Sequence, residues 1–144
     1  MSNAIPTFFY GSFINLDVLR RGGFEPRGYE RAILHGYDIK ISGLATLVRA
    51  ENSSVYGILA SATHSELDLL YGQDWLVRSY APEPVVVHTI GGEQRIALCF
   101  IAEHPAPRPS FDYLDWILKP ARAHGFPESY ITRLEEWDER IESI

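Results

Sequence analysis

The chain has 144 residues, of which 46% are hydrophobic and 22% charged, a composition typical of one globular domain (residues 1–144) with a sizeable core. The net charge of −6 argues against a nucleic-acid or anionic-membrane binder, because a surface of the same sign repels both. The sequence shows no signal-peptide pattern and no apolar run long enough to span a bilayer, so we expect a cytoplasmic protein.

The first predicted strand covers residues 7–10, which have high strand propensity. Gly11 follows and permits a tight turn, and Asn15 is a good N-cap for a helix whose apolar face starts at Leu16 and Leu19. A loop of this kind offers unpaired backbone N–H groups, which suit a carboxylate or phosphate. An ordinary strand-turn-helix is the alternative interpretation.

Further strands are predicted along the middle of the chain, at residues 32–41, 46–49, 54–60, 80–89 and 93–102. Gly91 and Gly92 form the turn of a hairpin between the last two.

A short helix is predicted after the third of these strands. Thr63 and Glu66 have the spacing of a capping box, and Gly72 is a natural end. Two helices follow at the C-terminus: the first starts with Ser110 as N-cap, contains Pro120 and ends at Gly125.

Pro127 opens the last helix as its first residue. Runs of strands with helices at their ends predict an α+β fold rather than alternating βαβ units.

Two residue types that often carry chemistry give weak signals. The only cysteine, Cys99, lies in the apolar run of residues 96–102, so we expect a buried, inert thiol and a reducing compartment. The five histidines show no ligand spacing, so neither a metal nor a cofactor is expected.

A set of ordered motifs resembles the gamma-glutamylcyclotransferase-like family. Tyr10-Gly11-Ser12 at the end of the first strand is similar to the family's Tyr-Gly-Ser-Asn signature. The other matching segments are Val55-Tyr56-Gly57-Ile58-Leu59, Leu67-Asp68, Tyr80 with Val85-Val86-Val87, and the tail from Pro109 through Tyr113, Gly125-Phe126-Pro127 and Tyr130 to Leu134. These matches cover most of the chain from Phe8 to Leu134.

The resemblance implies a small mixed β-barrel flanked by helices, with a pocket at one barrel mouth. It also implies an activity: the α-amine of a small γ-glutamyl substrate attacks its own γ-carbonyl, which releases 5-oxoproline and a free amine or amino acid. This reaction needs a base for the amine and donors for the developing oxyanion, but no metal.

The family's substrate loop falls on four consecutive residues of this sequence, Tyr10, Gly11, Ser12 and Phe13. Phe13 stands where the family usually has Asn, so a side-chain donor is replaced while the backbone donors remain. Tyr113 matches a pocket tyrosine of the animal enzymes. Its hydroxyl either binds substrate or belongs to a ring that packs on the barrel.

The position of the family's catalytic Glu is occupied by Tyr71. A phenol with an ordinary pKa near 10 is a poor base at neutral pH. Asp74 in the following loop and Glu83 on the next strand are the candidate replacements, and the third option is that no carboxylate serves. Each acid also has the ordinary interpretation of a solvated surface group.

Two further functions stay open from the sequence. One is a non-catalytic family member that keeps the pocket and binds a small carboxylate ligand or a protein partner. The other is a related cyclase that acts on a γ-glutamyl group attached to a larger molecule.

Overall fold

Five strands form a small closed barrel in a computed structural model that describes residues 4–107 and 113–137. The strands are β1 (Ile5–Phe9), β2 (Glu30–Lys40), β3 (Thr46–Ala62), β4 (Ala81–Thr89) and β5 (Gln94–Ile101). They follow one another in the order β1-β3-β2-β4-β5. The closing pair β1–β5 is parallel and every other pair is antiparallel. The α+β class predicted from the sequence pattern and the mixed barrel implied by the resemblance are both confirmed.

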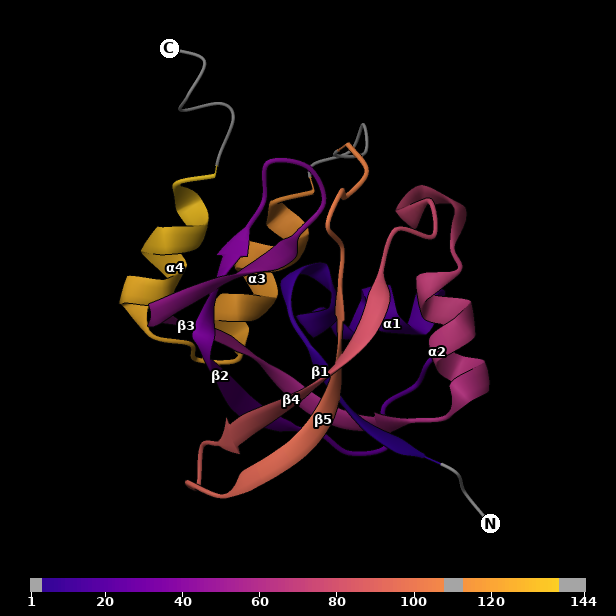
Figure 1. The fold of residues 1–144 in the computed structure, drawn as a ribbon, viewed down its shortest axis with the longest axis horizontal. Helices are drawn as coiled ribbons and strands as arrows, with labels where there is room; N and C mark the ends of the chain where they lie inside the picture. Colours follow the sequence, from indigo (N-terminus) through magenta and orange to yellow (C-terminus); the bar gives the residue numbers. More distant parts are fainter. Residues whose placement is uncertain (1–3, 108–112, 138–144) are drawn as a thin grey trace.

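Short helices flank this barrel. They are the 3-10 helices η1 (Gly11–Ile14) and η2 (Asp74–Leu76) and the α-helices α1 (Leu16–Arg21), α2 (His64–Tyr71), α3 (Asp115–Ala123) and α4 (Glu128–Glu135). α2 lies on the side of the barrel opposite α4, and α3 packs beside α4 (Figure 1).

The barrel interior is filled by alternate residues of the strands. On β4, Val85 and Val87 are buried whereas Val86 between them is 50% exposed. β1 and β3 approach so closely at Gly57 that a Cβ there would lie 2.2 Å from the carbonyl oxygen of Phe9. The substrate-loop residues that follow β1 are therefore attached to a strand in close backbone contact with β3.

One expectation about the strands is wrong. Residues 46–49 and 54–60 were expected to form two strands, but they belong to the single 17-residue strand β3. Its polar residues Glu51, Asn52 and Ser53 look like a turn, yet β2 pairs with β3 on both sides of them. The register shifts between His35 and Tyr37 instead, and pairing across the sheet therefore overrides the local turn signal.

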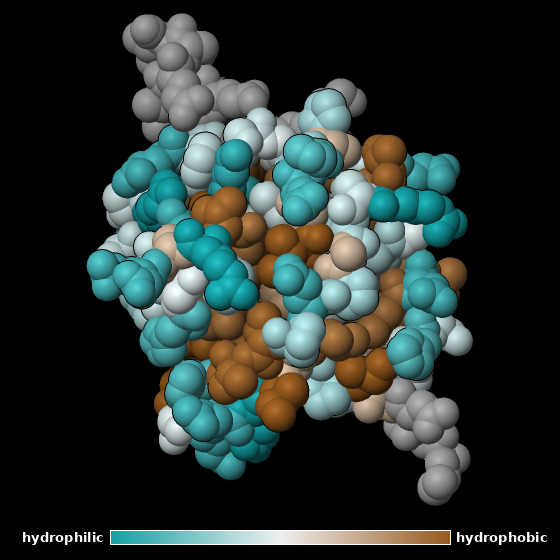
Figure 2. All heavy atoms as spheres, in the orientation of Figure 1, coloured by the Kyte–Doolittle hydropathy of each residue, from teal (hydrophilic) through white to brown (hydrophobic). Residues whose placement is uncertain are grey.

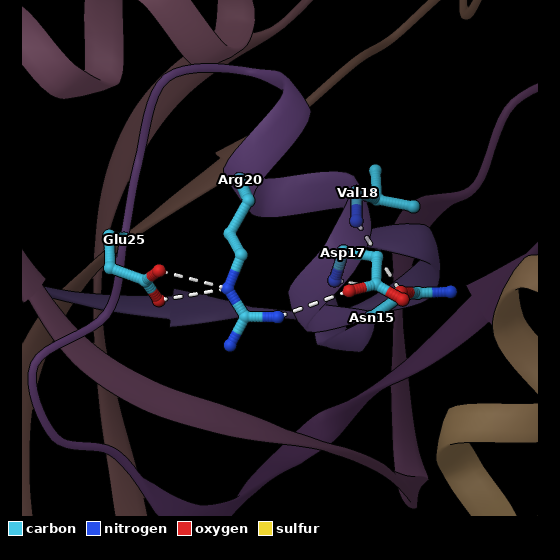
Figure 3. Close-up of polar contacts among 5 residues, drawn as sticks. All are labelled: Asn15, Asp17, Val18, Arg20 and Glu25. Carbon is cyan, nitrogen blue, oxygen red and sulfur yellow. Dashed lines mark hydrogen bonds and ion pairs between the residues drawn. The ribbon is translucent and has the colours of Figure 1, made fainter.

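Helix starts follow the sequence more closely. The Asn15 side chain accepts from the N–H groups of Asp17 at 3.0 Å and Val18 at 3.4 Å and so caps α1, as expected (Figure 3). The capping box is also confirmed: Thr63 Oγ1 accepts from Glu66 N–H at 3.1 Å, and Glu66 Oε1 accepts from Thr63 N–H at 2.9 Å.

The C-terminal helices differ in detail from expectation. Pro127 is the N-cap of α4 rather than its first residue. α3 begins at Asp115 and includes Pro120. Ser110, expected as its N-cap, lies outside the described residues.

The surface over β4 and β5 carries apolar side chains near the centre of the face in Figure 2. Val86 and Ile96 pair across this hairpin, and Ile96 is 75% exposed. In the described part of the chain, no helix is both long and apolar enough to cross a membrane.

Candidate functional site

The loop that leaves β1 is built around a glycine. Gly11 has a φ of +62°, in the left-handed region that favours glycine, and a Cβ at this position would lie 2.8 Å from the Cβ of Ala45. This close approach to Ala45 excludes any larger residue. The chain therefore turns directly from the strand into η1.

Hydrogen-bond donors remain unpaired at this turn. The backbone N–H groups of Gly11 and Ser12 are the first two of η1, and neither donates to another residue of the described structure. The Ser12 side chain is 6% exposed, and its hydroxyl also has no partner within residues 4–107 and 113–137. Two amides and one hydroxyl are thus available to a carbonyl or carboxylate oxygen.

Ser12 borders a small cavity with a volume of about 20 Å³, enough for about one water molecule, and Gly11 directly precedes Ser12 in the chain. The cavity is lined by Tyr10, Ser12, Phe13, Ala45, Tyr71, Leu76, Tyr80, Phe100 and Tyr113. We call Tyr10 to Phe13 the loop wall and Tyr71 with Leu76 the helix wall. The structure therefore places Tyr10, Ser12 and Phe13 of the expected substrate loop, together with Tyr113 and Tyr71, around one cavity, and Gly11 lies between two of its lining residues.

Three tyrosine hydroxyls are tied to the backbone around this cavity. Tyr10 donates to the carbonyl oxygen of Phe100 at 2.7 Å, and Tyr80 donates to the carbonyl oxygen of Ala45. Tyr113 accepts from the N–H of Ala45 at 2.9 Å. These bonds connect the barrel mouth with the start of α3.

Tyr71 is the exception among the tyrosines. Its ring stacks on Phe100 with centroids 3.9 Å apart and planes 11° apart. Its hydroxyl has no hydrogen-bond partner in the described structure. Burial, followed by the nearby Cys99 thiol, raises its pKa well above the ordinary value. Tyr71 therefore stays protonated at neutral pH and is a donor rather than a base.

The two departures from the family pattern touch each other. The rings of Phe13 and Tyr71 meet edge to face, with centroids 5.2 Å apart, and Phe13 also meets Trp75 in the same way at 6.3 Å. The resemblance implies an amide at position 13 and a carboxylate at position 71. Here both positions carry aromatic residues, which contact each other.

Asp74 is not brought into the cavity. It is the first residue of η2, is exposed, and does not line the cavity. Its neighbours Trp75 and Leu76 point toward the aromatic cluster instead. The catalytic role expected for Asp74 stays a prediction without geometric support.

Glu83 also does not line the cavity and is exposed, but unlike Asp74 it lies on a barrel strand. Strand alternation puts it on the same face of β4 as the buried Val85 and Val87. It pairs across the ladder with Cys99. Burial and then the Glu83 charge raise the pKa of the Cys99 thiol to about 12, and this thiol in turn raises the pKa of Tyr71. The Glu83 side chain itself lines a separate open hollow with Ser79, Glu103 and His104.

Some site features carry no sequence signal. Ala45 contributes only its backbone N–H and carbonyl groups to the hydrogen bonds around the cavity. In the sequence, Phe100 is indistinguishable from the other apolar residues of its strand. The loop is also held against α3, since Asn15 Nδ2 donates to the carbonyl oxygen of Trp116 at 3.2 Å and His124 Nε2 donates to that of Ile14 at 2.8 Å. Residues 4–107 and 113–137 contain no group of three or more His, Cys, Asp or Glu that could hold a metal ion.

Comparison with known proteins identifies the family. The AIG2-like family profile matches residues 54–134, more than half of the chain. No curated protein sequence matches significantly.

Among solved structures, a gamma-glutamyl cyclotransferase superimposes with a TM-score of 0.73 at 19% identity, covering 92% of this chain and 87% of its own. YkqA of Bacillus subtilis gives a TM-score of 0.73 at 23% identity, covering 94% and 54%. A yeast gamma-glutamyl cyclotransferase specific to glutathione gives 0.68 at 13% identity, covering 95% and 96%. These likenesses show a shared fold, and the profile match shows that the chain belongs to the AIG2-like family.

Proposed function

We propose that this chain is a γ-glutamylcyclotransferase-like enzyme that converts a small γ-glutamyl amine or peptide into 5-oxoproline and a free amine. One observation carries the proposal. Unpaired donors of Ser12, beside the unpaired N–H of Gly11, border a cavity at the position of the family's substrate loop. Family membership and the shared fold support it.

The loop wall supplies hydrogen-bond donors for the γ-carbonyl oxygen of the substrate. The substrate's α-amine attacks the γ-carbonyl carbon, and the donors of Gly11 and Ser12 stabilise the oxyanion that forms. The bond to the leaving nitrogen then breaks, and the proton lost by the amine is delivered to that nitrogen. Holding the substrate curled toward a five-membered ring lowers the barrier further.

The cavity must open for this substrate to enter. A volume of about 20 Å³ is smaller than a γ-glutamyl group. The loop wall is fixed to the barrel and to α3, whereas the Tyr71 hydroxyl of the helix wall has no hydrogen bond in the described structure. We therefore infer that the helix wall moves outward when substrate binds.

Glu83 is the base that we propose. Of the three candidates, Tyr71 stays protonated and Asp74 is exposed on η2, whereas Glu83 lies on β4 opposite Cys99. Its carboxylate takes a proton from the α-amine and returns it to the leaving nitrogen. The single cysteine is compatible with the cytoplasmic setting that we propose for the enzyme.

The test is 5-oxoproline release from a panel of γ-glutamyl amines and peptides. We expect product with at least one member, and Glu83→Gln should lower kcat by about 100-fold or more, the range for a lost general base. Asp74→Asn tests the rival acid, and Glu51→Gln, an exposed position on β3, is the control. No product from any member contradicts the proposal, and a loss in Asp74→Asn alone moves the role to that residue.

The Phe13–Tyr71 contact favours a second function, in which the pocket binds a small carboxylate ligand without turnover. No carboxylate of the described residues lines the cavity, and aromatic residues occupy the positions of the usual polar pair. Tyr71→Glu separates the two functions. Product formation by this variant alone supports a binding protein that has lost its base, whereas product formation by the wild type refutes it.

A further inference from the structure

A larger hollow adjoins the cavity on the outside of the barrel. This groove has a volume of about 580 Å³ and lies between α2 and the neighbouring ends of β4 and β5. It shares Tyr71, Tyr80 and Phe100 with the cavity, so these three rings separate the two spaces. Outward movement of the helix wall, inferred above, joins the two spaces, and the leaving part of a substrate whose γ-glutamyl group occupies the cavity then extends into the groove.

Arg78 is the cationic residue of this groove. It follows Val77 in the chain. The φ values of +54° at Val77 and +46° at Arg78 are the only positive ones for non-glycine residues in the described structure. Left-handed backbone is unfavourable for both side chains, and such outliers often mark functional sites. The unusual turn places Arg78 beside the end of α2, where a Cβ on Gly72 would lie 3.8 Å from its Nη2.

A purely structural role for Arg78 at this helix end has little support. Arginine can bind the free carbonyl groups at a helix C-terminus. Here the carbonyl oxygen of Asp68 accepts from Gly72 N–H at 2.9 Å and that of Leu70 accepts from Gln73 Nε2 at 2.9 Å. Arg78 itself forms no hydrogen bond or ion pair within the described part of the chain. Its guanidinium donors are free for a ligand.

We propose that Arg78 binds a carboxylate on the leaving part of the substrate, so the groove selects γ-glutamyl compounds whose leaving amine is an amino acid or peptide with a free acid. This inference rests on the proposed function for the orientation of the substrate. A planar guanidinium can form two parallel hydrogen bonds to one carboxylate, which fixes the leaving group as well as attracting it.

Asp68 gives the proposal an internal control. Its carboxylate lies on α2 in the same groove and is exposed, with the opposite sign to Arg78. Removing Asp68 should strengthen a preference for an acidic leaving part, and removing Arg78 should weaken it. His64 also lines the groove and is left unchanged in both variants.

The overall charge works against this preference. With a net charge of −6, the protein repels the more anionic of two otherwise similar ligands. A measured preference for the acid over its amide therefore reports a local positive group.

The experiment compares γ-glutamyl-alanine with γ-glutamyl-alaninamide, which differ only in the terminal carboxylate. For each compound, 5-oxoproline release gives kcat/KM and calorimetry gives the dissociation constant. We expect the wild type to prefer the acid by about fivefold, as for a favourable exposed ion pair. Arg78→Gln should remove this preference, Arg78→Lys should keep part of it, and Asp68→Asn should increase it. Arg27→Gln, an exposed charge loss outside the groove, is the matched control.

Each outcome is decisive. Equal efficiency with both compounds, or an acid preference that survives in Arg78→Gln, overturns the Arg78 site and leaves the proposed activity intact. Without product from either compound, the proposed activity fails. The Arg78 site then stands if the acid still binds more tightly and Arg78→Gln removes the difference, and it is overturned if the acid and amide bind equally.

Discussion

The loop wall and the helix wall of the cavity differ in what carries their chemistry. The loop wall offers backbone N–H groups of Gly11 and Ser12, which do not depend on side-chain identity except for the requirement for glycine at residue 11. In the helix wall, function depends on side chains, and Tyr71 has replaced the carboxylate that the resemblance leads one to expect. Substrate binding can therefore persist in a site whose catalytic group has moved or disappeared, and the two walls need separate tests.

The loop wall is most sensitive at Gly11. Gly11→Ala combines left-handed backbone with a contact of 2.8 Å to the Cβ of Ala45. We expect unfolding free energy to fall by about 3 kcal/mol and ligand binding to weaken, measured by urea denaturation and calorimetry. Gly36→Ala is the control, since its φ is +85° but a Cβ meets nothing within 4 Å. Equal losses in both variants would show that the approach to Ala45 contributes nothing.

The helix wall is tested by two replacements of Tyr71. Tyr71→Glu buries a carboxylate beside Phe100, and we expect a loss of about 2 kcal/mol in unfolding free energy. Tyr71→Phe keeps the stacked ring and removes a hydroxyl without a partner in the described structure, so the change should stay within about 0.5 kcal/mol. Thermal and urea denaturation compare the two. A larger loss in Tyr71→Phe would reveal a bond to this hydroxyl in solution.

The raised pKa of the Cys99 thiol predicts that the protein loses stability at alkaline pH. Its pKa rises from an ordinary 9.0 to about 12 in the folded protein, first by burial and then by Glu83. Because the unfolded chain releases this proton first, stability is full below pH 9 and is lost as pH rises toward about 12. The slope is about 1.4 kcal/mol per pH unit.

Denaturation between pH 9 and 10, below most tyrosine titration, checks this prediction. Cys99→Ala should reduce the slope there but not abolish it, because buried tyrosines whose pKa values are also raised contribute to the same loss. An unchanged slope in the variant would assign the alkaline loss to other groups.

The supports of the loop wall give the smallest effects. Asn15→Ala removes the cap of α1 and the bond to Trp116, with an expected loss of about 1 kcal/mol in unfolding free energy. Arg20→Ala on the same helix removes only exposed ion pairs to Asp17 and Glu25, so its loss should stay below about 0.5 kcal/mol (Figure 3). Chemical denaturation distinguishes them, and the reverse order would mean that the cap contributes less than the surface charges.

The parts of the fold that sequence could predict are those set by local physics. The Thr63–Glu66 capping box and the Asn15 cap involve groups within three residues of each other, and both are confirmed. The continuity of β3 through residues 51–53 was missed because it depends on pairing with β2, which no local pattern encodes.

The candidate site shows the same division. The loop wall could be located from Tyr10-Gly11-Ser12 because its geometry follows from one glycine. Ala45 could not be found, since it contributes a backbone group brought close by the barrel. Asp74 and Glu83 looked similar in sequence, and only the pairing of β4 with β5 sets Glu83 apart, because it lies opposite the buried Cys99 although its own side chain is exposed.

Amide chemical shifts of the loop wall test the central claim most directly. In a titration with γ-glutamyl-alanine followed by 1H–15N NMR, the N–H signals of Gly11 and Ser12 should move most, since these donors are unpaired in the described structure. Unchanged signals at Gly11 and Ser12, with the largest shifts in the separate open groove around Tyr29 and Arg95, would contradict binding at the cavity.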